Sequence, residues 1–367
     1  MTTTEITTTD HQTGHTTDAL VERLFGAVLA TLDVQSIYLG DRLGYYRALA
    51  GAGGLTSTEL ATRTGTAERY AREWLEQQAV TGILTASDDS DAARRRFTLP
   101  DGHAEPLTDV LSPTYLVPLA RLLGGVGKQP DALVEAYRTG GGVSWAEHGA
   151  DAREAQAAAN RPMFLGALGT EYLPSVPDVD TALRGGGRVA DIGCGMGWSS
   201  IRIALAYPDA TVDGYDLDVP SIEAARSNAA EAGVGDRVRF HLADATTVAG
   251  REYDVVAAFE CVHDLPDPVG VLAAMRGLAG DRGTVLVMDE RVAETFTAPG
   301  DDIERLMYGY SLLCCLPDGM AHQPSAGTGT VMRPDTLRDY AVRAGFAEVE
   351  VLAIENDFFR FYRLVRA

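Results

Sequence analysis

The sequence is poor in lysine, in cysteine and in long apolar segments. Lys128 is the only lysine, and acidic residues outnumber basic ones by 52 to 31, which gives a net charge of -21. This charge repels a phosphate backbone, so we expect no nucleic-acid partner. The four cysteines lack the spacing of a zinc site or a disulfide framework. No apolar run could span a bilayer and the N-terminus lacks the pattern of a signal peptide, so we expect a cytoplasmic protein without a membrane partner.

The 367 residues exceed the usual size of one hydrophobic core, so we expect more than one domain. Four regions differ in pattern. Residues 1–16 are Thr-rich and nearly free of apolar side chains, which predicts a disordered tail. A mainly helical domain over 17–110, helical linking segments over 111–180 and an α/β domain over 181–367 follow.

The region 17–110 has the pattern of a winged helix. Apolar residues recur at helical spacing over 19–49, which predicts two amphipathic helices. Thr56 and Glu59 have capping-box spacing and Gly65 follows where a short helix would end. A second helix is expected from Ala67 to about Val80, and the β-rich runs 82–84 and 96–99 are expected to form the wing.

The last region alternates strands and helices. Apolar runs predict five strands, and helical patterns lie between them, which is typical of a mainly parallel sheet. Two further β-rich runs predict a closing antiparallel hairpin. The expected fold class is α/β, a Rossmann-like seven-stranded sheet with a C-terminal hairpin. The expected strands are 188–192, 211–215, 238–242, 253–259, 284–288, 349–354 and 358–365, and the expected helices are 199–207, 219–232, 268–278 and 334–345.

A glycine-rich turn lies between the first strand and its helix. Its pattern is Asp191-x-Gly193-x-Gly195-x-Gly197, and glycines at a helix N-terminus let a ligand approach backbone amides. Asp216 ends the second strand, where a carboxylate can accept both ribose hydroxyls. Asp244 and Ala245 follow the third strand, where they suit an adenine ring. A structural turn and solvated loop acids are the alternative interpretations.

Taken together, these motifs and the hairpin resemble the class I S-adenosylmethionine (SAM)-dependent methyltransferases. The resemblance implies SAM as the cofactor, with the residues of the glycine turn around its methionine moiety. It also implies that Asp216 holds the ribose and that Asp244 addresses the adenine. We expect Leu217 and Phe259 to contact the cofactor as well.

His263 follows the fourth strand in the segment Phe259-Glu-Cys-Val-His-Asp-Leu-Pro-Asp-Pro268. This segment resembles the His-Asp-Trp stretch of winged-helix small-molecule O-methyltransferases, with Leu265 in place of the Trp. The resemblance implies that His263 is a general base and that Glu290 orients it. A purely structural His263 remains the alternative, and no metal is expected.

The acceptor is expected to lie among apolar side chains. Met163 and Tyr172 on one segment and Met307 and Tyr308 on another are the candidates that would join His263. Ordinary core packing explains the same pattern. The resemblance implies methyl transfer to an aromatic or other secondary metabolite, and oxygen, nitrogen and carbon acceptors all remain open.

A winged helix also allows a second function, that of a transcriptional regulator with SAM or another metabolite as effector. Its reading helix would carry Glu68, Glu73 and Glu76 against only two arginines, which makes it a poor DNA ligand. The resembling methyltransferases use this domain for homodimerisation. We therefore expect 17–110 to be a dimerisation domain, 111–180 to be a linker and active-site lid, and 181–367 to bind SAM.

Overall fold

The computed structural model describes residues 16–248, 250 and 252–366, so all but the last residue of the expected tail 1–16 lies outside the described part. The chain divides into two compact units, one ending at Thr108 and one beginning at Asp109. The four cysteines are free thiols. Among the described helices, none has the length and apolar character needed to cross a membrane.

The first unit is a winged helix with a long helix before it. The helices are α1 (Thr17–Arg42), α2 (Tyr45–Leu49), α3 (Ser57–Thr64), α4 (Glu68–Val80) and α5 (Asp101–Thr108), and the wing strands are β1 (Thr85–Ala86) and β2 (Phe97–Thr98). The expected capping box of α3 is present, and Gly65 ends that helix with a φ of 67°. The first wing strand lies just after the expected run 82–84, because the backbone at 82–84 still closes the end of α4, where the amides of Ile83 and Leu84 donate to Gln78.

The core of this unit is aromatic. The rings of Tyr45 and Tyr46 pack against Trp74 at centroid distances of 4.8 and 5.2 Å. The hydroxyl of Tyr46 donates to Gln78 at 2.5 Å, so its polar atom is satisfied inside the core. In contrast, α1 keeps a stripe of large apolar side chains exposed: Leu20, Val21, Leu24, Phe25, Val28, Leu29 and Leu32.

The second unit begins with helices that belong to the same compact body as the sheet. They are α6 (Val117–Val126), α7 (Pro130–Thr139), α8 (Trp145–Met163) and α9 (Pro177–Arg184), and a π-helical segment, η1 (Phe164–Tyr172), continues α8. The α8 helix is kinked at Gly149, where φ is 78° and ψ is -167°. This backbone conformation is accessible essentially to glycine alone.

The seven-stranded sheet has the order β5-β4-β3-β6-β7-β9-β8. Its strands are β3 (Arg188–Ile192), β4 (Thr211–Asp216), β5 (Val238–Leu242), β6 (Val255–Phe259), β7 (Thr284–Glu290), β8 (Glu348–Val351) and β9 (Phe359–Val365). The first five strands are parallel, whereas β9 is antiparallel to both β7 and β8. The expected fold class is therefore confirmed, including the closing hairpin. The register places Asp191 opposite Gly214 and Ala257, so the carboxyl ends of β3, β4 and β6 meet at one edge.

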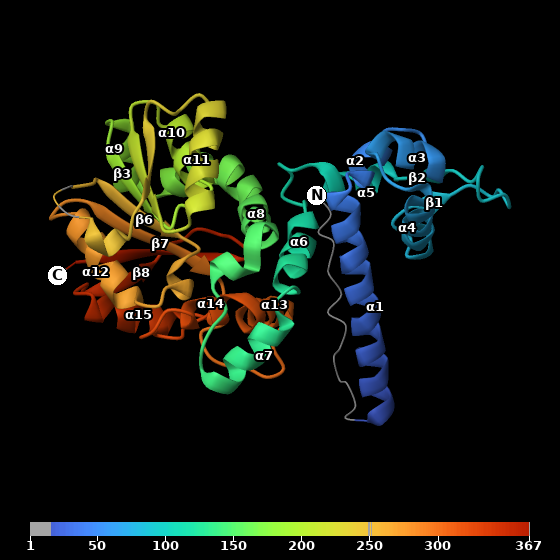
Figure 1. Ribbon diagram of the computed structural model, residues 1–367. Coiled ribbons are helices and arrows are strands. Elements are labelled where there is room, and N and C mark those ends of the chain that lie inside the picture. The colour runs from blue at the N-terminus through green and yellow to red at the C-terminus, as the bar shows by residue number, and fades with distance from the viewer. Residues whose placement is uncertain (1–15, 249, 251, 367) are drawn as a thin grey trace. The chain divides into compact units, whose positions relative to one another are not determined.

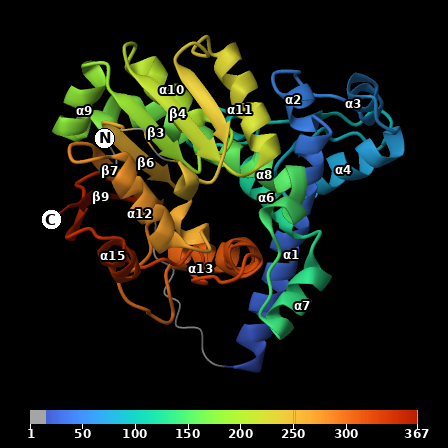
Figure 2. The same ribbon diagram turned by 60° about the vertical axis from the view of Figure 1, so that its left-hand side comes forward.

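Helices cover both faces of this sheet (Figure 1). One layer contains α9, α10 (Trp198–Ala206) and α11 (Val219–Glu231), whose apolar residues share a core with η1. The other layer contains α12 (Pro268–Leu278) and α15 (Pro334–Arg343), as Figure 2 shows from a second side. The side chains of the central strands β3, β6 and β7 are almost all buried, as is typical of parallel sheets, whereas β4 and the edge strand β5 keep several side chains partly exposed.

Three helical segments lie between β7 and α15. They are α13 (Asp302–Tyr310), a second π-helical turn, η5 (Ser311–Cys315), and α14 (Leu316–Met320). The α14 helix lies against the short turn η4 (Val262–Asp264) that follows β6, because a Cβ on Gly319 would lie 3.1 Å from the carbonyl oxygen of Asp264. This packing brings α14 to the sheet edge where the candidate site lies.

Candidate functional site

The glycine turn joins β3 to α10, and its three glycines are favoured for two physical reasons, close packing and a left-handed backbone. A Cβ on Gly193 would lie 2.7 Å from the sulfur of Cys261, and one on Gly197 would lie 2.5 Å from the Phe240 ring, so close packing requires glycine at both positions. A Cβ on Gly195 would meet no atom within 4 Å, although its φ of 49° is left-handed. The turn is therefore packed at its two ends and open at its middle, where a ligand can approach.

Asp191 is fully buried beneath this turn. Its Oδ2 accepts hydrogen bonds from the hydroxyls of Ser199 and Ser200, both at 2.6 Å, which ties the turn to the first residues of α10. Its Oδ1 has no hydrogen-bond partner among the described residues. Burial raises the pKa of Asp191 to about 6, although the two serine bonds oppose this change. An unmatched buried carboxylate oxygen indicates a donor that comes from a ligand or water.

The acids of the next two strands lie at their predicted places. Asp216 accepts from the amide of Gly195 at 2.8 Å, which links the end of β4 to the middle of the glycine turn. The neighbouring Leu217 is apolar but 69% exposed. Asp244 caps a short helical turn through the amide of Thr246 at 2.8 Å, and Ala245 beside it is buried.

His263 is the centre of a buried polar cluster. Its ring is 2% exposed, and its Nδ1 lies 2.7 Å from Asp289 Oδ1 and 3.0 Å from Glu290 Oε2. Its Nε2 lies 3.1 Å from Asp264 Oδ1. The structure thus brings His263 and Glu290 together, and it adds two carboxylates, Asp289 and Asp264, to which the sequence interpretation gave no role.

These carboxylates control the charge of the ring. Burial lowers the pKa of His263, but Asp264, Asp289 and Glu290 outweigh it and hold that pKa well above the ordinary value. Burial raises the pKa of Glu290, and the nearby Asp289 raises it further, whereas the proximity of His263 holds the pKa of Asp289 below its ordinary value. The cluster therefore retains protons at neutral pH.

Glu260 is a further residue that the sequence did not indicate. It follows β6 with a φ of 57°, the one left-handed non-glycine residue of the described chain. Its carboxylate accepts from Gln156 Nε2 at 2.7 Å and from the side-chain Nδ2 of Asn160, and both residues lie on α8. Burial raises its pKa to about 7. Backbone strain of this kind is concentrated at functional sites.

The expected acceptor residues divide into two groups. Tyr172 accepts from Asn356 Nδ2 at 3.0 Å, and the sulfur of Met163 lies 3.8 Å from the same nitrogen. Met307 is buried, and the hydroxyl of Tyr308 accepts from Arg333 at 3.3 Å. No hydrogen bond between described residues joins any of the four to His263, so their part in acceptor binding stays a prediction. Phe259, expected at the cofactor, packs edge-on against Phe164 at 5.9 Å.

Two groups of ligand-type side chains surround His263, although no metal was expected. Asp264 and Cys315 form one group with the ring, and Asp289 and Glu290 form the other, and the ligand atoms within each group lie within 4.8 Å of one another. In the second group Nδ1 is hydrogen-bonded to Asp289 at 2.7 Å, so this group is accounted for without a metal, as a histidine oriented by carboxylates.

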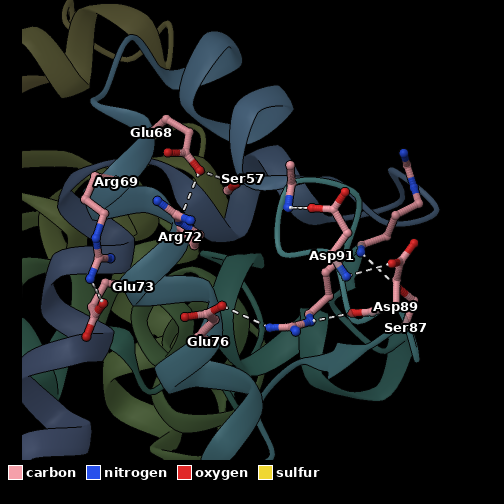
Figure 3. Close-up of polar contacts among 12 residues, drawn as sticks. Ser57, Glu68, Arg69, Arg72, Glu73, Glu76, Ser87, Asp89 and Asp91 are labelled. Atoms are coloured by element: carbon pink, nitrogen blue, oxygen red, sulfur yellow. Dashed lines mark hydrogen bonds and ion pairs between the residues drawn. The ribbon is translucent and has the colours of Figure 1, made fainter.

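The arginines of α4 and of the wing form ion pairs with acids (Figure 3). On α4, Arg69 pairs with Glu73 at 2.5 Å and Arg72 with Glu68 at 3.4 Å. At the wing, Arg95 pairs with Glu76 at 3.0 Å. These intramolecular pairs reduce the positive charge that a DNA backbone would need.

Comparison with known proteins agrees with this geometry. Residues 183–313 match a family model described as a methyltransferase domain, and residues 30–109 match one described as an Rv2258c-like winged HTH domain. The chain is 32% identical over 162 residues to the 27-O-demethylrifamycin SV methyltransferase of Amycolatopsis mediterranei, which spans 43% of this chain and 58% of that enzyme. It is 30% identical over 172 residues to a ubiquinone biosynthesis O-methyltransferase of Aromatoleum aromaticum, which spans 46% and 68%.

Solved structures share the whole fold at low identity. The mitomycin 7-O-methyltransferase MmcR superposes with a TM-score of 0.72 at 21% identity, covering 95% of this chain and 98% of that one. Human N-acetylserotonin methyltransferase gives a TM-score of 0.66 at 18% identity, with coverages of 96% and 100%.

The glycine turn, the acids after β4 and β5 and the antiparallel closing strands define a Rossmann-like cofactor-binding enzyme. The sequence relatives narrow this class. The chain belongs to the SAM-dependent methyltransferases, with an N-terminal winged-helix domain.

The turn has features that fit SAM. The open space above Gly195 leaves room for the cofactor, and the unmatched Asp191 Oδ1 suits a donor such as the ammonium of its methionine moiety. The exposed apolar Leu217 beside Asp216 suits a nucleoside.

Proposed function

We propose that this protein transfers the methyl group of SAM to a small aromatic or related secondary metabolite and that His263 accepts the proton which the acceptor loses. Bound SAM supplies an electrophilic methyl group on a sulfonium. The glycine turn and Asp216 would hold the cofactor, and Asp244, Ala245, Leu217 and Phe259 would surround its nucleoside. The buried contact between His263 and its carboxylates is the observation that carries the proposal.

The geometry supports a base whose tautomer is fixed. Asp289 accepts from Nδ1 at 2.7 Å and Glu290 lies on the same side, so Nε2, which lies 3.1 Å from Asp264 Oδ1, is the nitrogen that would take the proton of the acceptor. Because the pKa of His263 is held high, the neutral ring that can take a proton is populated mainly at alkaline pH. We therefore expect kcat/KM to rise with pH above 7.

The test measures S-adenosylhomocysteine (SAH) formation with hydroxylated aromatic acceptors, and SAM affinity by calorimetry. His263→Ala is expected to lower turnover by roughly 10² to 10⁴ and to leave SAM affinity nearly unchanged. Glu290→Gln is expected to lower turnover less, because Asp289 still orients the ring. Full activity of His263→Ala would return this residue to a structural role.

We also propose a homodimer formed through the N-terminal unit. The α1 helix exposes seven large apolar side chains in one stripe, including Leu24, Phe25 and Val28, and a contiguous apolar stripe of this kind is typical of an interaction surface. Leu24→Glu combined with Val28→Glu is expected to give monomers in light scattering. Two matched changes in exposed polar residues of the wing, Asp88→Lys and Ser90→Lys, should leave the dimer intact. A stable dimer of the α1 variant would place the interface elsewhere.

A transcriptional regulator is the alternative function. It is disfavoured because the arginines of α4 already form ion pairs with glutamates of the same helix. A mobility-shift assay on random duplex DNA is expected to give no complex at physiological salt. A complex of submicromolar affinity would favour the regulator.

A further inference from the structure

His148 is a buried side chain without a role in the proposed function so far. It is the fourth residue of α8, directly before the kink at Gly149, and it is 1% exposed. Neither Nδ1 nor Nε2 has a hydrogen-bond partner among the described residues. An unsatisfied buried donor or acceptor costs about 1–3 kcal/mol, so native structures rarely retain one unless water or a ligand completes it.

The surroundings of His148 connect it to the methyl-transfer centre. Asp318 on α14 accepts from the amide of Trp145, the first residue of α8, at 2.7 Å. Burial and the carboxylate of Asp264 raise the pKa of Asp318 to about 7, whereas the rings of His148 and His263 oppose this change. Asp318 therefore lies in the electrostatic range of both histidines.

Backbone contacts hold these segments close together. The amide of Val143 donates to the carbonyl of Pro317 at 3.0 Å, and a Cβ on Gly142 would lie 2.2 Å from that same carbonyl oxygen. On its other side, α14 approaches the His263 turn at Gly319. The start of α8 and the His263 turn thus pack on the same short helix.

An apolar cluster connects the segment of His148 with the group of side chains around His263. Trp145, near His148, and Cys315, in the ligand-type group of His263, both pack on a cluster formed by Leu122, Val126, Ala152, Ala155 and Cys314. Burial lowers the pKa of His148, so its ring is neutral at pH 7 and offers one donor and one acceptor.

We propose, on the basis of the function above, that His148 together with Asp318 binds a second polar group of the acceptor, at the end away from the atom that is methylated. The acceptor class is an apolar ring system with two hydroxyl or carbonyl groups. Carboxylated acceptors are disfavoured, because a further carboxylate would be buried beside four acids, Asp264, Asp289, Glu290 and Asp318, where a negative charge is costly.

The experiment compares 2-naphthol with 2,3-, 2,6- and 2,7-dihydroxynaphthalene as acceptors for the full chain, using SAH formation as the readout. At least one diol is expected to exceed 2-naphthol in kcat/KM by about tenfold. His148→Leu should reduce this preference to less than about twofold, and His148→Gln, which keeps a donor and an acceptor, should retain it. 3-Hydroxy-2-naphthoic acid should be a poor acceptor throughout.

Thermal unfolding without acceptor gives an independent readout. His148→Leu is expected to raise the melting temperature by a few degrees, because it removes unsatisfied polar atoms from the interior. The matched control is His241→Leu: His241 Nε2 lies 2.6 Å from Asp213 and its ring stacks on Tyr215, so this change should lower the melting temperature.

Each outcome decides the proposal. A diol preference that survives in His148→Leu, or the absence of any diol preference in the wild type, overturns it, as does a lower melting temperature of His148→Leu. Calorimetric SAM binding distinguishes a failure of the His148 assignment from a failure of the proposed function. If SAM binds and SAH forms from 2-naphthol, the proposed function stands even when the assignment of His148 fails. If no acceptor yields SAH, both fail.

Discussion

Replacing Asp264 by Asn tests how the buried cluster sets the charge of His263. The carboxylate oxygen lies 3.1 Å from Nε2, and Asn keeps the size of the side chain while it removes the charge. Even with the dielectric constant of bulk water, two unit charges at this separation interact by about 1.3 kcal/mol, which corresponds to about one unit on the pH scale. A protein interior makes the effect larger.

The direct assay is an NMR titration of protein with ¹⁵N-labelled histidine from pH 5.5 to 10, which needs no acceptor. The His263→Asn variant identifies the His263 signal among the seven histidines. In Asp264→Asn the ring should titrate at lower pH than in the wild type by about one unit or more, and the rise of kcat/KM with pH should move in the same direction. Asp236→Asn, on an exposed side chain outside the site, is the control.

An unchanged titration of His263 in Asp264→Asn would refute the reasoning, because the cluster would then not act through charge. A shift toward higher pH would be equally damaging. It would mean that the carboxylate of Asp264 favours the neutral form of the His263 ring in the wild type.

Three further predictions follow from the same geometry. Gly195→Val should abolish SAM binding in calorimetry, because the new side chain fills the open part of the turn at a left-handed φ, and retained affinity would contradict the assignment of the turn. The free energy of unfolding, measured in urea, should fall as the pH rises from 5.5 to 7.5. The reason is that burial raises the pKa of Glu260 and Asp318 to about 7 and that of Asp191 to about 6, so the folded chain keeps protons that unfolded carboxyls have lost; His148, whose pKa is lowered, is a single group that opposes this trend. A free energy of unfolding that rises over this range would show that burial does not govern the pKa values of these acids. Dialysis against EDTA should leave turnover unchanged, whereas a loss that Zn²⁺ restores would make His263 a metal ligand.

Local sequence signals predicted most of the second unit. The strands at 188–192 and 238–242 have the expected bounds, since each is a short apolar run that ends at a turn. The capping box of α3 was equally visible, because its two side chains are three residues apart. The strand bounds and the capping box depend on residues close together in sequence, so periodicity and spacing predict them directly.

The polar clusters could not be predicted in the same way. Glu260 meets Gln156 and Asn160 across about one hundred positions, and Asp318 meets Trp145 across even more. Asp289 stands next to Glu290 in sequence, so only the structure could show that it makes the shorter contact with His263. The π-helical segments after Met163 and Tyr310 were also missed, because a wider helical turn leaves nearly the same apolar pattern as an α-helix.

The strand order has a consequence for how the chain is made. The β9 strand is the last of the seven in sequence, yet it lies between β7 and β8 inside the sheet. During synthesis β7 leaves the ribosome long before its neighbour exists, and its hydrogen-bonding edge stays open until β9 emerges. The nascent chain therefore carries an unpaired sheet edge on β7 after the cofactor turn has been made. A ribosome that stalls between residues 290 and 359 would leave a product prone to pair with other chains.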